Sequence, residues 1–453
     1  MKFGGSSIAD AQRILAVAEI VRGRLARRPV VVVSALAGVT DLLVRAVRAA
    51  CAADLEVLEP ILADLERRHR WALAGSVEDP GERHDLSLEI DGLFEELRRK
   101  LRSIRILGEG TARAADSVFA TGELLSARIV AAAFRGRGLP ARFVDPRDVV
   151  ITDSRFGEAS PDVAAIAVRS AERLTPLLGA GEIPVLGGFV GATPDGDTTT
   201  LGRGGSDTSA AVLGAALGVE EIQIWTDVDG MMSADPRLVP LARTIPRLSF
   251  AEAAELAFYG AKVLHPDSIA PAVERKIPVR VLNSHRPAAE GSVVLDAPAD
   301  DRAAELVSVA SRVGVRTIRV LSRRMRADAG FVAGVLDTFR ASGIAPDLVV
   351  ASEVAVHAAI PADVDLARVV PELDRFGGVE VHEERAIVCI VGSGLMGAGL
   401  ARRRALEGLA AFEPEIVGVG ASAAGLAAVL PASRLVDAVR GLHHAFFEDG
   451  ASR

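Results

Sequence analysis

Short runs of apolar and β-branched residues alternate with helical patterns over the first two thirds of this chain, and this alternation restricts its fold more than any other feature. The runs lie at residues 30–34, 142–144, 149–152, 185–190, 221–226 and 278–282. Helical patterns lie between them, chiefly at residues 41–135, 161–178 and 209–217. Strands that alternate with helices form mainly parallel sheets that are covered on both faces. The sequence therefore predicts an α/β domain of this type.

A second pattern begins after residue 302. Residues 287–302 are rich in Pro, Ala, Gly and Asp and lack a periodic pattern, so we place a domain boundary there. Beyond it, the order strand-helix-strand-strand-helix occurs twice, over residues 317–375 and again over residues 386–447. Two copies of this order predict a pair of ferredoxin-like modules. The predicted domains are residues 1–297, 305–380 and 381–450.

The composition is typical of a soluble globular protein, with 49% hydrophobic and 25% charged residues. The formal net charge of −8 argues against nucleic acid as a main partner. We find no apolar run long enough to cross a membrane and no signal peptide. Cys51 and Cys389 lie far apart in apolar surroundings, and the histidines show no ligand spacing. We therefore expect a cytoplasmic protein with reduced thiols and no metal site of its own.

A glycine-rich stretch combines two charged residues with a helix start. Gly187-Gly188-Phe189 follows an apolar run, and residues 201–211 (Leu-Gly-Arg-Gly-Gly-Ser-Asp-Thr-Ser-Ala-Ala) lead into a helix of small residues. Glycines and a helix N-terminus bring backbone N–H groups close to an anion. Arg203 can bind a carboxylate and Asp207 an ammonium group. The loop is typical of a site for an amino acid beside a nucleotide, although a plain connection with a surface ion pair has the same composition.

Three further segments accompany this loop. The chain opens with Lys2-Phe3-Gly4-Gly5, residues 225–237 are Trp-Thr-Asp-Val-Asp-Gly-Met-Met-Ser-Ala-Asp-Pro-Arg, and residues 258–266 are Phe-Tyr-Gly-Ala-Lys-Val-Leu-His-Pro. The chain has only four lysines, and two of them, Lys2 and Lys262, fall in these segments. In this order and over nearly the whole chain, the motifs resemble those of aspartate kinases (aspartokinases). These are members of the amino acid kinase superfamily, and the resemblance is to monofunctional enzymes with C-terminal tandem ACT domains.

The resemblance implies transfer of the ATP γ-phosphoryl group to the side-chain carboxylate of L-aspartate, which gives 4-phospho-L-aspartate and begins lysine, threonine and methionine biosynthesis. An ionised carboxylate needs no general base, so catalysis rests on positioning and on neutralisation of phosphate charge. Lys2 and Asp207 match the catalytic positions. Substrate-binding positions are matched by Thr40, Glu123, Arg203, Ser206 and Asp207. ATP-binding positions are matched by Lys2, Phe3, Gly4, Gly5, Thr226, Asp227, Met232, Arg237, Lys262 and Val263.

In these relatives the arginine binds the α-carboxylate of aspartate, and the acids that match Glu123 and Asp207 lie near its ammonium group. From the residues alone, Glu123 is equally well explained as a cap after Thr121-Gly122, and Asp227 as a turn residue. We expect Mg²⁺ to arrive with ATP as co-substrate.

The chain departs from the family at two points near the nucleotide. Met232 stands where a tyrosine is usual, and only Met1 precedes the Lys2 motif where the family has a strand. We expect that this first strand is reduced, or that the sequence is short at its N-terminus.

The ACT modules imply regulation and assembly. In the family the second module is threaded within the first, so we expect the last strand and helix to pack on the first module. We expect a homodimer or larger assembly through paired modules, and feedback inhibition by lysine ahead of threonine. Effector positions are matched by Met325, Gly330, Val332, Asp347, Ser352 and Glu353, whereas Ala327 replaces a histidine that is common in lysine-sensitive relatives. A purely structural role for these residues stays open.

Three other functions compete with this interpretation. Residues 392–397 fit the dinucleotide motif G-x-G-x-x-G, but only 56 residues follow them, which is too few for a dinucleotide-binding fold. A kinase of the same superfamily with a different acid or a carbamate as substrate remains open. The third is a catalytically weak amino-acid sensor with a vestigial kinase domain. Met232 and the reduced first strand favour it slightly, but the intact Arg203, Asp207 and Lys262 weigh more heavily against it.

Overall fold

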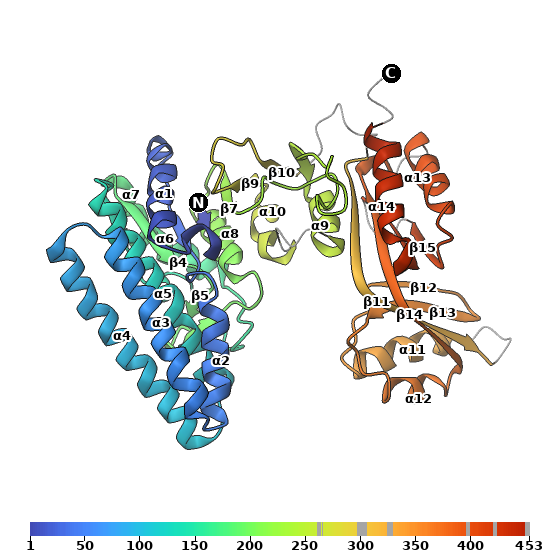
Figure 1. Cartoon of the computed structure of the whole chain (residues 1–453), viewed down its shortest axis with the longest axis horizontal. Helices are drawn as coiled ribbons and strands as arrows, with labels where there is room; N and C mark the ends of the chain where they lie inside the picture. The colour runs from blue at the N-terminus through green and yellow to red at the C-terminus, as the bar shows by residue number, and fades with distance from the viewer. Residues whose placement is uncertain are drawn as a thin grey trace. The chain divides into compact units, whose positions relative to one another are not determined.

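The computed structural model of the chain describes residues 1–260, 264, 266–296, 306–323, 329–395, 399–419 and 424–448 (Figure 1). The chain forms two compact units, Met1–Gly230 with Val263–Asp296, and Met231–Lys262 with Ala297–Arg453. The sequence places Met231–Lys262 in the first domain, whereas its contacts group it with the second unit. The reason is that buried residues of this segment, such as Ala234 and Val239, pack into the core of the second unit.

The first unit is built on a mainly parallel sheet, as predicted. In this unit the strand order is β3-β4-β2-β1-β7-β9-β10, in which β9 and β10 are antiparallel and the other pairs parallel. The strands are β1 (Lys2–Phe3), β2 (Val31–Val33), β3 (Ala141–Phe143), β4 (Ile183–Gly187), β7 (Ile222–Thr226), β9 (Val279–Asn283) and β10 (Ser292–Leu295), and β5 (Val190–Ala192) and β6 (Thr198–Thr200) form a separate antiparallel pair. The strand predicted at residues 149–152 is wrong. Only isolated bridges form there, at Ile151 and at Thr152, whose partner Pro161 has no N–H with which to extend a ladder.

Helices cover both faces of this sheet. They are α1 (Ala11–Arg22), α2 (Val39–Cys51), α3 (Leu55–Ser76), α4 (Pro80–Leu107), α5 (Ala112–Gly136), α6 (Val163–Arg173), α7 (Thr175–Gly179), α8 (Gly205–Leu217) and α10 (Ala270–Glu274). Successive residues of a strand point to opposite faces. Accordingly Phe3 is buried in the core formed with α1 to α5, whereas Lys2 reaches α8.

The central helix α5 is unusually apolar. It is long and apolar enough to cross a bilayer by length and composition, but 83% of its most apolar stretch is buried inside the unit. It contacts β2, β3 and β4 on one side and α3 and α4 on another. We therefore interpret α5 as a core helix.

The second unit contains an antiparallel sheet in the order β12-β13-β11-β14-β16-β15. Its strands are β11 (Ser308–Ser322), β12 (Leu348–Ala351), β13 (Ala355–Pro361), β14 (Gly377–Val391), β15 (Ile416–Val419) and β16 (Gly425–Pro431). Its helices are α9 (Phe250–Tyr259), which follows the short strand β8 (Arg247–Ser249), then α11 (Ala329–Ala341), α12 (Val369–Leu373), α13 (Leu400–Ala410) and α14 (Leu435–His443).

The 15-residue strands β11 and β14 serve both halves of this sheet. Val309 of β11 packs with α13 and α14, whereas Ile318 and Val320 of the same strand pack with α11 and α12. The helix α14 contacts both β11 and β14. The sequence predicts only residues 317–321 and 386–391 as strand, because charged side chains such as Arg316 and Glu384 interrupt the apolar runs.

Two adjacent glycines of β14 offer a test of this packing. A Cβ at Gly377 would overlap the carbonyl oxygen of Leu321 on β11, whereas a Cβ at Gly378 would meet nothing within 4 Å. We predict that Gly377→Ala destabilises the second unit by about 1–3 kcal/mol, the usual cost of overpacking. Gly378→Ala is the matched control. Thermal unfolding followed by circular dichroism should show a lower midpoint for Gly377→Ala alone, and equal midpoints would contradict this packing.

Candidate active site

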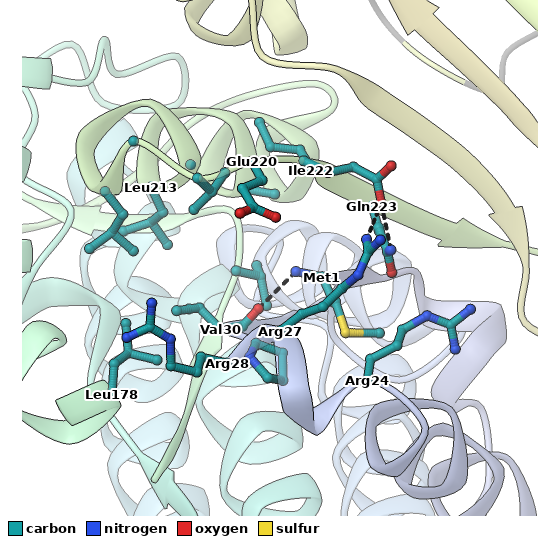
Figure 2. A pocket seen from close by; sticks show the side chains of 18 of the residues that line it. Met1, Arg24, Arg27, Arg28, Val30, Leu178, Leu213, Glu220, Ile222 and Gln223 are labelled. Carbon is teal, nitrogen blue, oxygen red and sulfur yellow. Dashed lines mark hydrogen bonds and ion pairs between the residues drawn. The ribbon is translucent and has the colours of Figure 1, made fainter. Parts of the chain in front are cut away.

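The two ends of the parallel strands differ in what surrounds them. At the amino ends of β1, β2 and β7 lies a cavity of about 580 Å³, lined by Met1, Val30 and Ile222 among others (Figure 2). At the carboxyl ends lie the glycine-rich segments of the sequence. From β1 the chain adds strands to both sides of the sheet, with β2 on one side of β1 and β7 on the other, so the direction in which strands are added changes there. In open α/β sheets, ligands bind outside the carboxyl ends at such a switch point, so we place the candidate site there.

An ion pair lies at this point. The Nζ of Lys2 is 2.7 Å from Oδ1 of Asp207, and the two side chains are 11% and 12% exposed. Lys2 is held by parallel pairing of β1 with β2 and β7. Phe3 stacks on Trp225 of β7 on the opposite face. The two predicted catalytic residues are therefore brought together, and each neutralises the other.

Two helices begin beside this pair without a side-chain cap. The caps of α2 and α8 are Gly38 and Gly204, both with positive φ and with no side-chain hydrogen bond. By contrast, an Asp or Thr side chain caps each of the other described helices of more than ten residues in the first unit and accepts a backbone N–H there. These helices are α1, α3, α4, α5 and α6. The N–H groups of Val39, Gly205 and Asp207 donate to backbone carbonyls. Among the first-turn N–H groups, those of Thr40 and Ser206 are therefore left for an anionic ligand. Thr40 lies in the first turn of α2, and Ser206 and Asp207 in that of α8.

The paired glycines at the end of β4 let two helices approach the sheet closely. A Cβ at Gly188 would lie 2.7 Å from Cβ of Ser206, and a Cβ at Gly187 would lie 2.9 Å from Cβ of Glu123. The sequence interpretation assigns these glycines to anion approach. The structure instead gives them a packing role, because they place Ser206 and Glu123 beside the strand end.

Glu123 lies inside α5 and is only 3% exposed, so the interpretation as a helix cap is wrong. Its Oε2 has no hydrogen-bond partner among the described residues. Burial raises the pKa of this carboxyl to about 8, and a hydrogen bond from the backbone of Ala35 opposes the rise. A buried carboxyl with an unpaired oxygen can accept a cationic ligand.

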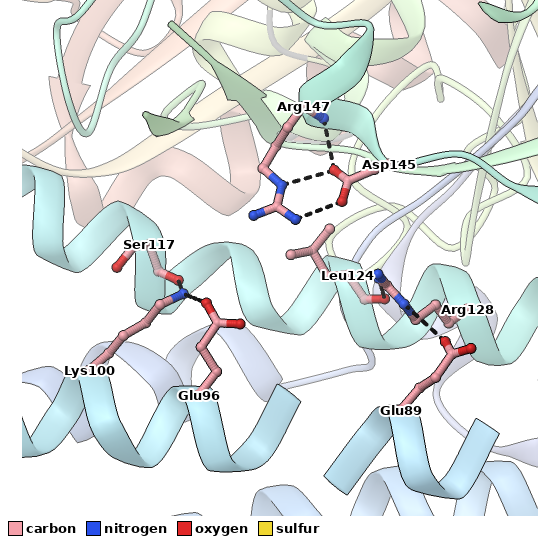
Figure 3. A network of polar contacts seen from close by, with 8 residues as sticks. All are labelled: Glu89, Glu96, Lys100, Ser117, Leu124, Arg128, Asp145 and Arg147. Atoms are coloured by element: carbon pink, nitrogen blue, oxygen red, sulfur yellow. Dashed lines mark hydrogen bonds and ion pairs between the residues drawn. The ribbon is translucent and has the colours of Figure 1, made fainter. Parts of the chain in front are cut away.

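Polar contacts hold α5 in place (Figure 3). The Nζ of Lys100 on α4 donates to the carbonyl of Ser117 at 3.0 Å and pairs with Glu96 at 2.7 Å. Arg128 of α5 donates to the carbonyl of Leu124 and lies over the ring of Phe143. Arg128 also pairs with Glu89 of α4 at 3.5 Å, so these contacts join α5, which carries Glu123, to α4 and β3.

Serines that sequence reasoning did not assign line the same edge. Ser34, directly after β2, donates to Oγ of Ser206 at 3.1 Å. Ser7 donates to Oγ of Ser284 at 2.8 Å, and Ser284 donates to the carbonyl of Thr226. Ser34 and Ser284 each follow an apolar run, which is the signal that could have found them.

The remaining predicted residues fall into three groups. Arg203 is exposed between Gly202 and Gly204, and Asp227 is exposed after β7, where it accepts a hydrogen bond from Thr226. Met232 and Arg237 belong to the second unit, where Arg237 pairs with Asp235 at 2.7 Å. Lys262 and Val263 lie outside the described residues, as does Met325 among the effector positions.

The other effector positions lie in the second unit. Gly330 and Val332 lie in α11, and Ser352 and Glu353 are exposed. Asp347 precedes β12 and pairs with Arg312 of β11 at 2.9 Å, with its own side chain 6% exposed. Burial raises the pKa of the Asp347 carboxyl, and Arg312 opposes this. The arginine thus pairs with one oxygen of the carboxylate expected to hold an ammonium group, whereas Oδ2 has no hydrogen-bond partner among the described residues.

Comparison with known proteins finds relatives over the whole chain. Residues 1–283 match the amino acid kinase family. The chain is 35% identical to lysine-sensitive aspartokinase 3 of Escherichia coli over 99% of this chain and 98% of that protein, and 34% identical to the chloroplastic aspartokinase 3 of Arabidopsis thaliana over 99% and 81%.

Solved structures give the same result. The crystal structure of E. coli aspartokinase III in complex with lysine and aspartate (T-state) has a TM-score of 0.85 and 33% identity, and covers 99% of both chains. The complex of that enzyme with aspartate and ADP (R-state) has a TM-score of 0.82. With its mainly parallel kinase sheet, its second antiparallel unit and full-length relatives of this kind, the chain belongs to the aspartokinase family.

Proposed function

We propose that this protein transfers the γ-phosphoryl group of ATP to the side-chain carboxylate of L-aspartate and so forms 4-phospho-L-aspartate. The observation that carries the proposal is the group formed by Lys2, Asp207 and the buried Glu123 beside two glycine-capped helix starts. This group offers cationic and backbone N–H partners for phosphate together with acidic partners for an ammonium group.

The chemistry needs positioning more than it needs a base. The aspartate side chain attacks as a carboxylate, so the protein has to bring it in line with the γ-phosphorus and neutralise charge. Lys2 would leave Asp207 in part and share its ammonium with the transferred phosphoryl oxygens. The N–H groups that begin α2 and α8 would bind phosphate or carboxylate oxygens, and Mg²⁺ would enter with ATP.

The substrate itself would be held by charge. Arg203 would bind the α-carboxylate, and Glu123 and Asp207 would face the α-ammonium group. Glycine on each side of Arg203, at Gly202 and Gly204, gives the loop the left-handed turns that present this side chain. A catalytically weak sensor is not favoured, since the charged groups of the site are assembled.

Regulation is also part of the proposal. We infer lysine as the feedback effector, acting on the second unit through Asp347 and Glu353, and assembly as a homodimer or larger oligomer through the ACT modules. A cytoplasmic enzyme of lysine, threonine and methionine biosynthesis would be regulated in this way. Because Arg312 pairs with Oδ1 of Asp347 and Oδ2 has no partner among the described residues, the ammonium group of an effector would join this arginine or displace it.

Glu123 gives a pH prediction. With a pKa of about 8 the carboxyl is neutral at pH 7, and it must ionise to hold an ammonium group. We predict that kcat/KM for aspartate rises with pH by up to about tenfold per unit below pH 8 and then levels off. Glu123→Gln should remove this rise and lower kcat/KM, while kcat/KM for ATP serves as the control. An unchanged pH profile in Glu123→Gln would contradict the assignment.

The charged loop gives a second prediction. Arg203→Ala and Asp207→Ala should each lower kcat/KM for aspartate by about 30-fold or more, as expected for loss of at least ~2 kcal/mol when a charged partner is removed. Arg169→Ala, which removes a half-exposed arginine paired with Glu172 on α6, is the control. A lower kcat/KM for aspartate in steady-state kinetics, with an unchanged thermal unfolding midpoint, would support the site assignment. A kcat/KM near the wild-type value in both variants would overturn it.

The effector prediction concerns Asp347. We expect millimolar lysine to inhibit the wild-type enzyme more than threonine does, with coupling of about 1–3 kcal/mol. Asp347→Asn should raise the half-inhibitory lysine concentration. Asp337→Asn, an exposed change on α11, should leave it unaltered. Aspartate saturation curves with and without each amino acid measure this, and a response to threonine alone would reassign the effector.

A further inference from the structure

A second buried carboxylate lies on α5, outside the groups considered so far. Asp116 is fully buried and accepts three hydrogen bonds. Its Oδ2 accepts the backbone N–H groups of Gly157 and Thr200, each at 2.9 Å, and its Oδ1 accepts the hydroxyl of Thr200 at 2.7 Å. Two of these donors are backbone groups, so the carboxylate fixes the course of the chain at Gly157 and at Thr200.

These hydrogen bonds join two segments that are distant in sequence. The loop 153–160 is closed by the bridge between Thr152 and Pro161, and Thr200 ends β6. Ala159 adds a backbone hydrogen bond to the carbonyl of Thr200 at 2.9 Å. Asp116 therefore joins α5, the loop 153–160 and the end of β6 through its hydrogen bonds.

The strand end that Asp116 holds leads directly into the loop that carries Arg203. Leu201 donates its N–H to Phe189 at 2.9 Å. Gly202 then lies against the loop 153–160, where an added Cβ would be 3.3 Å from Cγ of Glu158. Arg203 follows and is exposed. One side of the Arg203 loop thus rests on the segments that Asp116 joins, and the other side is the start of α8.

Asp116 and Glu123 lie on the same helix, seven residues apart, which places them on one face two turns apart. The helix itself is fixed by Lys100, which donates to the carbonyl of Ser117, the residue next to Asp116. A single rigid helix therefore carries Glu123 directly and sets the base of the Arg203 loop through Asp116.

We propose that Asp116 is a positioning residue for aspartate binding, because it fixes the Arg203 loop at a set distance from Glu123. This inference rests on the proposed function, in which Arg203 binds the α-carboxylate and Glu123 faces the α-ammonium group of one small substrate. The α-carboxylate and the α-ammonium group are attached to one carbon atom, so their two partners have to be held at a matching separation.

The test compares Asp116→Asn with the wild type. Asparagine keeps the shape but is uncharged, so it weakens the hydrogen bonds from the two N–H groups. Its NH₂ group can face the Thr200 hydroxyl only if that hydroxyl accepts instead of donating. We expect the KM for aspartate to rise about tenfold or more, as misplacement of a binding group by a fraction of an ångström allows. The KM for ATP should stay within about twofold, because the hydrogen bonds of Asp116 lead to the aspartate loop.

A double-mutant cycle separates positioning from a merely structural role. If Asp116 acts through Arg203, adding Asp116→Asn to Arg203→Ala should lower kcat/KM for aspartate by less than about twofold further. Additive losses, equal changes in both KM values, or wild-type kinetics in Asp116→Asn would each overturn the proposal. Asp162→Asn is the matched control, because this exposed carboxylate accepts the N–H groups of Ala164 and Ala165 at the start of α6.

Thr200 provides a milder variant in case Asp116→Asn does not fold. Thr200→Val removes only the hydroxyl bond and should raise the KM for aspartate, whereas Thr200→Ser should restore it. Equal KM values for these two variants would overturn the proposal. A wild-type enzyme that neither binds aspartate in calorimetry nor phosphorylates it would overturn the proposed function and this inference together. If the wild type binds and phosphorylates aspartate, and Asp116→Asn has the same KM for aspartate as the wild type, this inference alone would be overturned.

Discussion

The two-residue strand β1 is the constraint on which the first unit depends. It lies between β2 and β7 at the centre of the sheet, and its two side chains do different work. Phe3 is buried in the helical core and stacks on Trp225, and this burial fixes the strand in register. Lys2 is consequently placed on the other face, within 2.7 Å of Asp207. A shift of β1 by one residue would exchange the two faces and place Lys2 in the core. The packing of Phe3 in the core therefore also determines where the ammonium group of Lys2 lies.

The helix α5 is a second element that positions residues of the candidate site. It is buried along most of its length, and polar contacts to α4 and β3 leave it little freedom. Glu123 and Asp116 both project from it, and each is a carboxyl buried in the unit. Burying a carboxyl group costs free energy unless hydrogen bonds from a ligand or a backbone segment compensate it. For Asp116 the structure shows the compensating N–H groups, whereas Oε2 of Glu123 has no hydrogen-bond partner among the described residues.

In the second unit the long strands β11 and β14 unite the two halves. Each strand contributes side chains to two clusters, so the two halves share these strands. Asp347 and Arg312 lie on this framework, and α9 packs on both long strands. An amino acid that competes with Arg312 for Asp347 would therefore act on a connected sheet.

The sequence determined the fold class and the residue types from which the candidate site is proposed. Alternating strands and helices are local patterns, and the motifs around Lys2, Arg203 and Asp207 carry charges whose chemistry is visible from residue types alone. Only the tertiary structure decided which charges meet. The pairing of Lys2 with Asp207 and of Arg312 with Asp347 depends on strand register, and the raised pKa of Glu123 depends on burial. The lengths of β11 and β14, the packing role of Gly187 and Gly188, and the hydrogen bonds of Asp116 likewise arise from segments distant in sequence, whose contacts no local pattern records.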